Sequence, residues 1–175
     1  MKIPYDLTLR DFKVNSVSAD IRLEDVRAHN LDVKSVSGSM SLKDTGGDTM
    51  TLANVSGHIN VDYRDIPTSE LRAKTVSGHI NVEAKAAILK LNTVSGSVKL
   101  YTGEDVKDIA IGTVSGGITL GLPENDGFDT RFSSVSGRFN SEFPVEMSGK
   151  HGIYKNGDIE ISLGTVSGGI KIVRR

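Results

Sequence analysis

The chain has 175 residues, a formal net charge of −1 and no cysteine, and its Lys and Arg residues are scattered among Asp and Glu. This length fits one domain, and the balanced charge argues against a protein that follows nucleic-acid phosphates. The absence of cysteine excludes disulfides and thiolate zinc sites. No apolar run reaches the roughly 20 residues that span a bilayer. We therefore expect no nucleic-acid partner and no transmembrane segment in this chain.

The N-terminal residues 1–6 lack the continuous apolar segment of a signal peptide. Two interpretations stay open: a cytoplasmic protein, or a mature or excised part of a longer chain. Repeat sequence begins almost at once, which supports the second interpretation.

A Val-Ser motif recurs eight times from one end of the chain to the other. The valines are Val17, Val36, Val55, Val76, Val94, Val114, Val135 and Val166. Subtracting successive numbers gives spacings of 19, 19, 21, 18, 20, 21 and 31 residues, which lie in the range of short structural repeats. Gly follows every Val-Ser pair except the first, where Ala19 stands. The repeats cover almost the whole chain, so we expect one repeat domain over residues 1–175.

Each repeat contains two short stretches in which apolar residues alternate with polar ones. The positions four and six residues after each Val are apolar except at Ser141, and those three and five residues before it also alternate. A period of two predicts strands with one buried face. The last apolar residue of the first strand lies three places before the Val, and in a regular strand residues three places apart point to opposite faces. If the Val also points inward, the backbone must therefore bend or bulge just before it. Gly two places after the Val predicts a second irregular position, where the missing Cβ lets the backbone turn or approach a neighbouring backbone closely.

The segments between the strand pairs carry turn residues, as at residues 44–48, 63–67 and 123–127. Stacking identical corners in phase places successive coils about 4.8 Å apart. The sequence therefore predicts an all-β fold, a single-domain parallel β-solenoid (β-helix) of about eight coils. Its Val-Ser-Gly corner recurs every 18–21 residues.

The main irregularity lies between Val135 and Val166, where the spacing grows by about half a coil. We expect an inserted or distorted coil at about residues 141–157, forming a hairpin that covers one end of the rod. A functional loop is the alternative, because long insertions in repeat arrays often lie on binding faces. The candidate contact residues in this segment are Val145, Met147, His151, Ile153 and Tyr154.

Polar residues flank every Val, as Thr113 and Ser115 flank Val114. If the Val points inward, both neighbours point outward and form two ladders along the stack. We interpret the side chains of these ladders as hydrogen-bond partners of the backbone donors and acceptors at the bend. Such arrays are similar to the Thr-x-Thr faces of some ice-binding proteins, but the mixture of Ser, Thr and Asn argues against a flat ice-binding face.

Two neighbouring repeats share a His and a carboxylate in the same phase, His58 with Asp62 and His79 with Glu83. The His and the carboxylate are about four residues apart along an extended strand, roughly 13 Å, which is too far to share one ion. We therefore expect no metal site and no cofactor.

Candidate catalytic carboxylates for polysaccharide cleavage are Asp62 with Glu83, or Asp20 and Glu24 around Arg22. They are more plausible as charge pairs between coils on a solvated face. We therefore assign no catalytic residue.

The repeats of the form Thr-Val-Ser-Gly-x-Ile-x-Val, together with residues 128–144 and the closing repeat at 165–172, resemble the bacterial putative-adhesin, or toastrack, family of β-solenoid domains. The resemblance spans essentially the whole chain. It implies a non-enzymatic module of the bacterial envelope, in some members linked to envelope-stress responses, with no shared catalytic motif.

The function expected from these features is a non-catalytic binding or scaffold module of the bacterial cell envelope. Its partner would be an envelope component or another protein, and self-association through the solenoid ends is a further expectation. The first alternative is a polysaccharide-active β-helix enzyme, and the second, less favoured one is an ice-binding protein.

Overall fold

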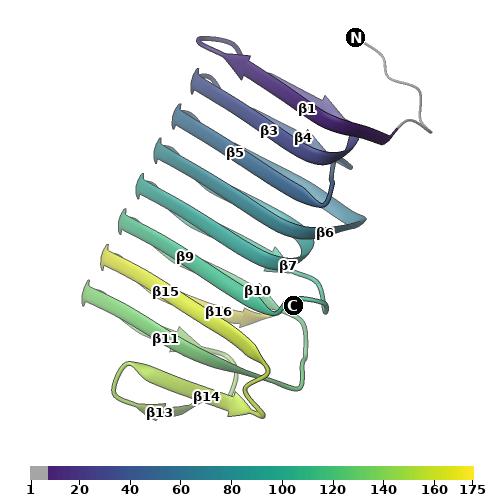
Figure 1. Ribbon diagram of the computed structural model, residues 1–175. Coiled ribbons are helices and arrows are strands. Elements are labelled where there is room, and N and C mark those ends of the chain that lie inside the picture. Colours follow the sequence, from purple (N-terminus) through teal and green to yellow (C-terminus); the bar gives the residue numbers. More distant parts are fainter. Residues whose placement is uncertain (1–7) are drawn as a thin grey trace.

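The computed structural model describes residues 8–175, apart from the side chains of Thr8, Arg64, Asp65 and Pro67. The described chain folds into sixteen strands (Figure 1). The strands are β1 (Thr8–Ser16), β2 (Ile21–Glu24), β3 (Arg27–Ser37), β4 (Met40–Lys43), β5 (Thr49–Ser56), β6 (Ile59–Ser77), β7 (Ile80–Ser95), β8 (Val98–Thr102), β9 (Asp108–Ser115), β10 (Ile118–Leu122), β11 (Gly127–Ser136), β12 (Phe139–Ser141), β13 (Glu146–Ser148), β14 (His151–Lys155), β15 (Ile159–Ser167) and β16 (Ile170–Arg174). No helix long and apolar enough to cross a membrane occurs among residues 8–175.

The coils form two layers joined at the Val-Ser-Gly corners. The strand before each corner belongs to one layer and the strand after it to the other, and neighbouring coils pair in parallel (Figure 1). The long strands β6 and β7 contribute to both layers, because each starts after one corner and ends at the next. This arrangement confirms the predicted all-β parallel β-solenoid.

The stacking order departs from the expectation that each coil pairs with the next one in sequence. Six turns stack in chain order, from β1–β2 to β9–β10. The last coil then lies between its predecessors, with β15 between β9 and β11 and β16 between β10 and β12. This order gives the C-terminal coil a partner on both edges. It also leaves β11 outermost in its layer of parallel coils, where the antiparallel strand β14 pairs with its outer edge.

The core lies between the two layers and is filled by the alternating apolar residues of each coil. In the coil of β9 and β10 these residues are Ile109, Ile111, Ile118 and Leu120, each 0–3% exposed. The equivalent side chains of the other coils join them in one continuous cluster. Each such side chain contributes roughly 1.5–3 kcal/mol on burial, which conformational entropy largely offsets.

The orientation of the corner valines is opposite to the predicted one. Val114 is 48% exposed, whereas Thr113 before it is only 6% exposed. Burial alternates without a break along β9 up to Thr113, so no bulge precedes the Val. The prediction of two outward polar ladders is therefore wrong for the residue before each Val, which points inward, and right for Ser115, which is exposed.

Inward hydroxyl and amide groups form hydrogen bonds inside the corner, which explains why a polar residue takes this position. Thr113 Oγ1 donates to the Gly96 carbonyl of the neighbouring coil at 3.1 Å. The same contact recurs from Thr93 to Gly78 at 3.2 Å, from Thr165 to Gly116 at 3.2 Å and from Asn54 to Gly38 at 2.8 Å. A valine there could not supply a donor to the carbonyl of the partly buried glycine.

Replacing Thr113 with Val is expected to lower the free energy of unfolding by about 1–2 kcal/mol, because the Gly96 carbonyl loses its side-chain donor. Thr113→Ser keeps the hydroxyl and serves as the matched control. Urea unfolding of the three proteins measures the difference. Equal losses in both variants would show that the methyl group, and not the hydrogen bond, stabilises the corner.

Candidate functional site

The eight corner valines form a row of exposed apolar side chains along one edge of the rod, which we call the valine ridge. In spatial order it consists of Val17, Val36, Val55, Val76, Val94, Val114, Val166 and Val135. The six interior members are 47–50% exposed, and the two at the ends, Val17 and Val135, are 73% and 82% exposed. Adjacent corners pair in register, so the valines repeat at about 4.8 Å. A continuous apolar row on a surface is typical of a contact site.

A shallow groove of about 460 Å³ runs beside the valine ridge on the outer face of β6, β7, β9, β15 and β11. The outward position two residues before each Val holds Lys74 and Asn92, then Gly112 and Gly164, then Ser133. The Asn92 side chain reaches over Gly112, where a Cβ would lie 2.6 Å from Asn92 Oδ1, whereas a Cβ on Gly164 would only touch Ser133 Oγ at 3.4 Å. The floor of the groove is therefore bare backbone at Gly164 and not at Gly112.

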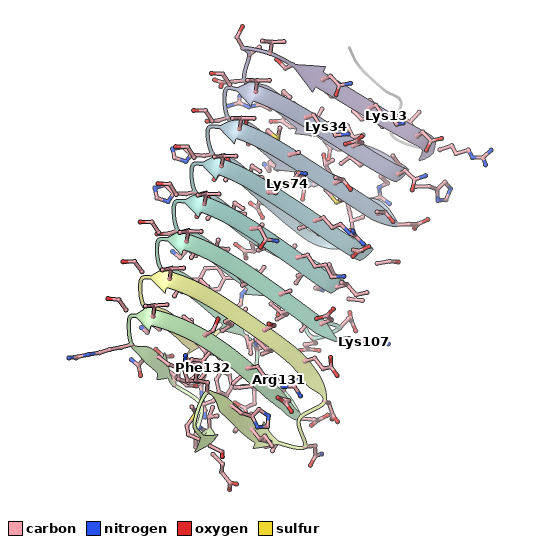
Figure 2. The ribbon with its side chains drawn as sticks, turned by 60° about the vertical axis from the view of Figure 1, so that its left-hand side comes forward. Lys13, Lys34, Lys74, Lys107, Arg131 and Phe132 are labelled. Atoms are coloured by element: carbon pink, nitrogen blue, oxygen red, sulfur yellow. The ribbon has the colours of Figure 1, made fainter. Side chains whose placement is uncertain are left out.

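The face beside the groove carries charges of both signs, and Figure 2 shows Lys34, Lys74 and Arg131 along it. Lys34 pairs with a carboxylate of its own strand at 2.7 Å, and Arg72 pairs with Glu70 at 2.9 Å. The hydrogen bond from Arg72 holds the pKa of Glu70 below its ordinary value. The surroundings of the groove therefore do not favour a ligand of one charge sign.

The predicted contact residues of the inserted segment lie on or beside the hairpin of β13 and β14, but they do not share one surface. Tyr154 is 5% exposed, and Val145 is half-buried against the core. His151 is half-buried with its Nε2 atom 2.7 Å from a carboxylate of β11. Met147 and Ile153 are 46% and 40% exposed and, by the pairing register, lie on opposite faces of the hairpin. A contact role for this segment stays a prediction.

Tyr154 fixes the hairpin against the coil of β11 and β12. Its ring centroid lies 5.3 Å from that of Phe128 and 5.1 Å from that of Phe143, and its hydroxyl donates to Glu124 Oε1 at 2.7 Å. Hydrogen bonds from Lys155 and then Tyr154 lower the pKa of Glu124. Removing Tyr154 would therefore disturb the core as well as any contact.

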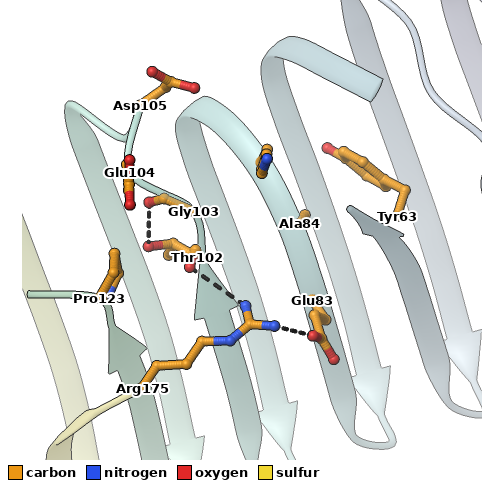
Figure 3. Close-up of a pocket in the computed structure, with 10 residues that line it drawn as sticks. Tyr63, Glu83, Ala84, Thr102, Gly103, Glu104, Asp105, Pro123 and Arg175 are labelled. Atoms are coloured by element: carbon orange, nitrogen blue, oxygen red, sulfur yellow. Dashed lines mark hydrogen bonds and ion pairs between the residues drawn. The ribbon is translucent and has the colours of Figure 1, made fainter. Parts of the chain in front are cut away.

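A pocket of about 430 Å³ opens on the side of the rod away from the ridge, beside the turn after β8 (Figure 3). Its mouth is crossed by Arg175, which pairs with Glu83 and donates to the Thr102 carbonyl at 3.4 Å. Tyr63 lies in its wall and is fully buried. The pair of Arg175 and Glu83 holds the end of the chain in place, and the lining does not define a reaction class.

Burial of Tyr63 raises its pKa to about 12, against a smaller opposite effect of the Thr68 hydroxyl. Because the folded-state pKa lies above the unfolded value of 10.0, the stabilisation by the neutral phenol is complete below pH 10. It is lost as the pH rises through 12. We expect a loss on the order of 2 kcal/mol by pH 12 that Tyr63→Phe lacks.

Thermal melting at pH 9 to 12 measures this loss of stability. It is carried out on the wild type, on Tyr63→Phe and on Tyr101→Phe, in which the replaced tyrosine is half-buried and serves as the control. Parallel curves for wild type and Tyr63→Phe would show that Tyr63 does not titrate in the folded protein.

The two aligned histidines serve the backbone of the corners. Their rings stack with centroids 5.1 Å apart. His58 Nδ1 accepts the amide of His79 at 3.1 Å, and His79 Nδ1 accepts the amide of Ser97 at 2.9 Å. Within the described part of the chain, no group of three His, Asp or Glu side chains could hold a metal ion.

The fold and the ridge define a β-solenoid with an exposed apolar edge and no evident catalytic constellation among its described residues. The model of the Toastrack DUF4097 family matches residues 3–105 and 86–173, so the chain belongs to this family. The resemblance found in the sequence is confirmed.

The chain is also similar in structure to a putative cell adhesion protein from Clostridium sporogenes. The TM-score is 0.55 at 14% sequence identity, over 99% of this chain and 96% of that one. At this identity the likeness shows the fold alone. No curated protein matches the sequence.

Proposed function

We propose that the protein is a non-catalytic binding module of the bacterial cell envelope and that the valine ridge contacts its partner. The observation that carries the proposal is the unbroken row of eight valines, each 47–82% exposed. A strand surface tolerates Thr as well as Val, so solvation alone would not select an apolar residue at every corner. Covering this row removes apolar surface from water, which favours binding by roughly 25 cal/mol per Å².

Membership of the Toastrack family supports a binding role. On the same face as the groove, Glu70 forms ion pairs with Arg72 and Lys90, and Asp32 forms one with Lys34, which is the arrangement of a solvated surface. The envelope location is supported by the likeness to a protein described as a putative cell adhesion protein. A scaffold role is compatible with the same edge, because one partner chain could contact several coils.

Capture from separated bacterial membrane and cell-wall fractions tests the proposal. The immobilised wild type is compared with the triple variant Val94→Thr, Val114→Thr and Val166→Thr, which changes the ridge beside the groove. We expect the variant to lose capture of the species that the wild type retains. Because Val and Thr are both β-branched and these positions are half-exposed, the circular dichroism spectrum should stay unchanged.

The matched control is Met147→Thr with Ile153→Thr, which removes the exposed apolar side chains of the hairpin. Capture should persist in this control. Loss in the control with retention in the ridge variant would move the contact to the hairpin and contradict the proposal. Turnover of a glycan that a single carboxylate substitution abolishes would contradict the non-catalytic assignment.

A further inference from the structure

The two ends of the rod differ in how the strand edge of one layer is covered. At the β11 end, the antiparallel strand β14 pairs with the outer edge of β11, whereas β12 in the other layer pairs only with β16 among the described strands. At the opposite end, within the described chain, β1 pairs only with β3 and β2 only with β4. Among residues 8–175, no strand covers the outer edges of β1 and β2, and their backbone donors and acceptors can pair with a further pair of strands.

Core side chains of both end coils are only partly buried, and Phe132 and Phe139 are examples in the coil of β11 and β12. At the β1 end the partly buried side chains are Phe12, Val14 and Leu23. Their partners one coil further in are 0–1% exposed: Leu31, Val33 and Leu42. One additional layer of strands would complete the burial of these three side chains.

The charges of β1 match those of a second copy of β1 in antiparallel orientation. When the pairing is centred on Phe12, Asp11 of one copy lies opposite Lys13 of the other, and Lys13 opposite Asp11. Both side chains are exposed on the outer face. Directly opposite unlike charges stabilise an antiparallel pair, and like charges destabilise it.

The charges of β2, in the second layer, also match those of a second copy in antiparallel orientation. In β2, Arg22 and Glu24 are exposed and flank the inward Leu23. Antiparallel pairing centred on Leu23 brings Arg22 opposite Glu24 of the second copy in both directions. A two-fold axis perpendicular to the layers therefore matches unlike charges in both of them.

We propose that two copies of the chain associate end to end through β1 and β2 and form a closed two-fold dimer. Pairing of identical edges uses up both edges, so the assembly stops at two copies. The antiparallel arrangement places the two valine ridges on opposite sides of the double-length rod. The dimer thus offers two contact edges, which is a bivalent arrangement.

Charge reversal provides a test that does not depend on one variant alone. The first variant carries Asp11→Lys and Glu24→Arg, so that positive side chains face each other in its own dimer. The second carries Lys13→Asp and Arg22→Glu, so that negative side chains face each other. Mixing the two variants restores unlike charges at every position. Sedimentation equilibrium should show a dimer for the wild type, a monomer for each variant and a dimer for the equimolar mixture.

The control Glu146→Lys changes the exposed outer strand at the opposite end and should leave the dimer intact. A wild type that stays monomeric up to about 100 μM, roughly 100-fold above a Kd of about 1 μM, would overturn the proposal. Dimers of each charge-reversed variant on its own would also overturn it. So would the absence of dimers in the mixture when both variants keep the wild-type circular dichroism spectrum.

A cross-link checks the register directly. Opposite residues in an antiparallel pair have Cα atoms about 4.5–5.5 Å apart, which suits a disulfide. Because the chain has no cysteine, Phe12→Cys should form a single covalent dimer on oxidation, and Met147→Cys should not. Equal cross-linking of the two variants would contradict the pairing through β1.

Discussion

Deleting the C-terminal coil, residues 159–175, is expected to abolish cooperative folding. This coil lies inside the stack, so its removal separates β9 from β11 and β10 from β12. It also removes five side chains that are 0–6% exposed: Ile159, Ile161, Leu163, Ile170 and Ile172. At roughly 1.5–3 kcal/mol each, their burial is comparable to the whole stability of a typical domain, about 5–15 kcal/mol.

The matched control begins at residue 25 and lacks the first coil, which within residues 8–175 has a neighbouring coil on one side only. In a stacked array, stability is close to a sum of coil and interface contributions. The control should therefore melt at a lower temperature but in one transition. Thermal melting followed by circular dichroism distinguishes the two proteins. Similar melting of both would show that the last coil is an end coil, contrary to the stacking order in the structure.

Substituting Gly116 with Ala is expected to lower the free energy of unfolding by about 3 kcal/mol or more. Gly116 has a φ of +153°, and a Cβ there would overlap the carbonyl oxygen of Gly96 in the neighbouring coil. Because the obstacle is backbone within a paired ladder, it cannot move without disturbing both coils. Urea unfolding measures the loss.

Ala19 at the first corner shows why the motif tolerates one exception. The coil of β1 and β2 ends the described stack, so no further described coil lies beyond Ala19. Ala19→Gly should therefore change stability by less than about 1 kcal/mol, through the unfolded chain alone. If Gly116→Ala were equally mild, the corner glycines would not be required by close approach of the backbones.

The sequence was sufficient to predict the strands and the solenoid because the apolar alternation on both sides of each Val is nearly unbroken. It was not sufficient to predict the stacking order. Leu163 in β15 and Phe132 in β11 occupy the same inward position, and either coil could pair with β9 on the basis of polarity alone. The order depends on the path of the chain between residues 123 and 158, which repeat spacing does not specify.

The direction of the corner valines was predicted wrongly because polarity was given more weight than alternation. Extending the alternation of Ile109 and Ile111 by one step places Thr113 inside and Val114 outside, as the structure shows. The hydrogen bond from Thr113 to the Gly96 carbonyl removes the cost of burying the hydroxyl. Ile111 and Val114 are three places apart, and in a regular strand this spacing places them on opposite faces. The sequence therefore already indicated that the corner valines point outward.

The inserted segment illustrates a different limit. Its apolar composition indicated an unusual element, but a short hairpin buries alternate residues on one face only. Which residues face the core depends on the three aromatic rings of Phe128, Phe143 and Tyr154, which come together from separate parts of the chain. Repeat spacing carries no information on that cluster.

Protection of a single thiol on the valine ridge is the most direct test of its proposed contact role. The chain has no cysteine, so Val114→Cys introduces one reactive group at a position that is 48% exposed in the native protein. Lys99→Cys on the exposed outer face of β8 is the control. Adding the captured envelope component should slow maleimide modification at position 114 several-fold and leave position 99 unchanged. Equal modification rates at position 114 with and without the component would contradict a contact through the ridge.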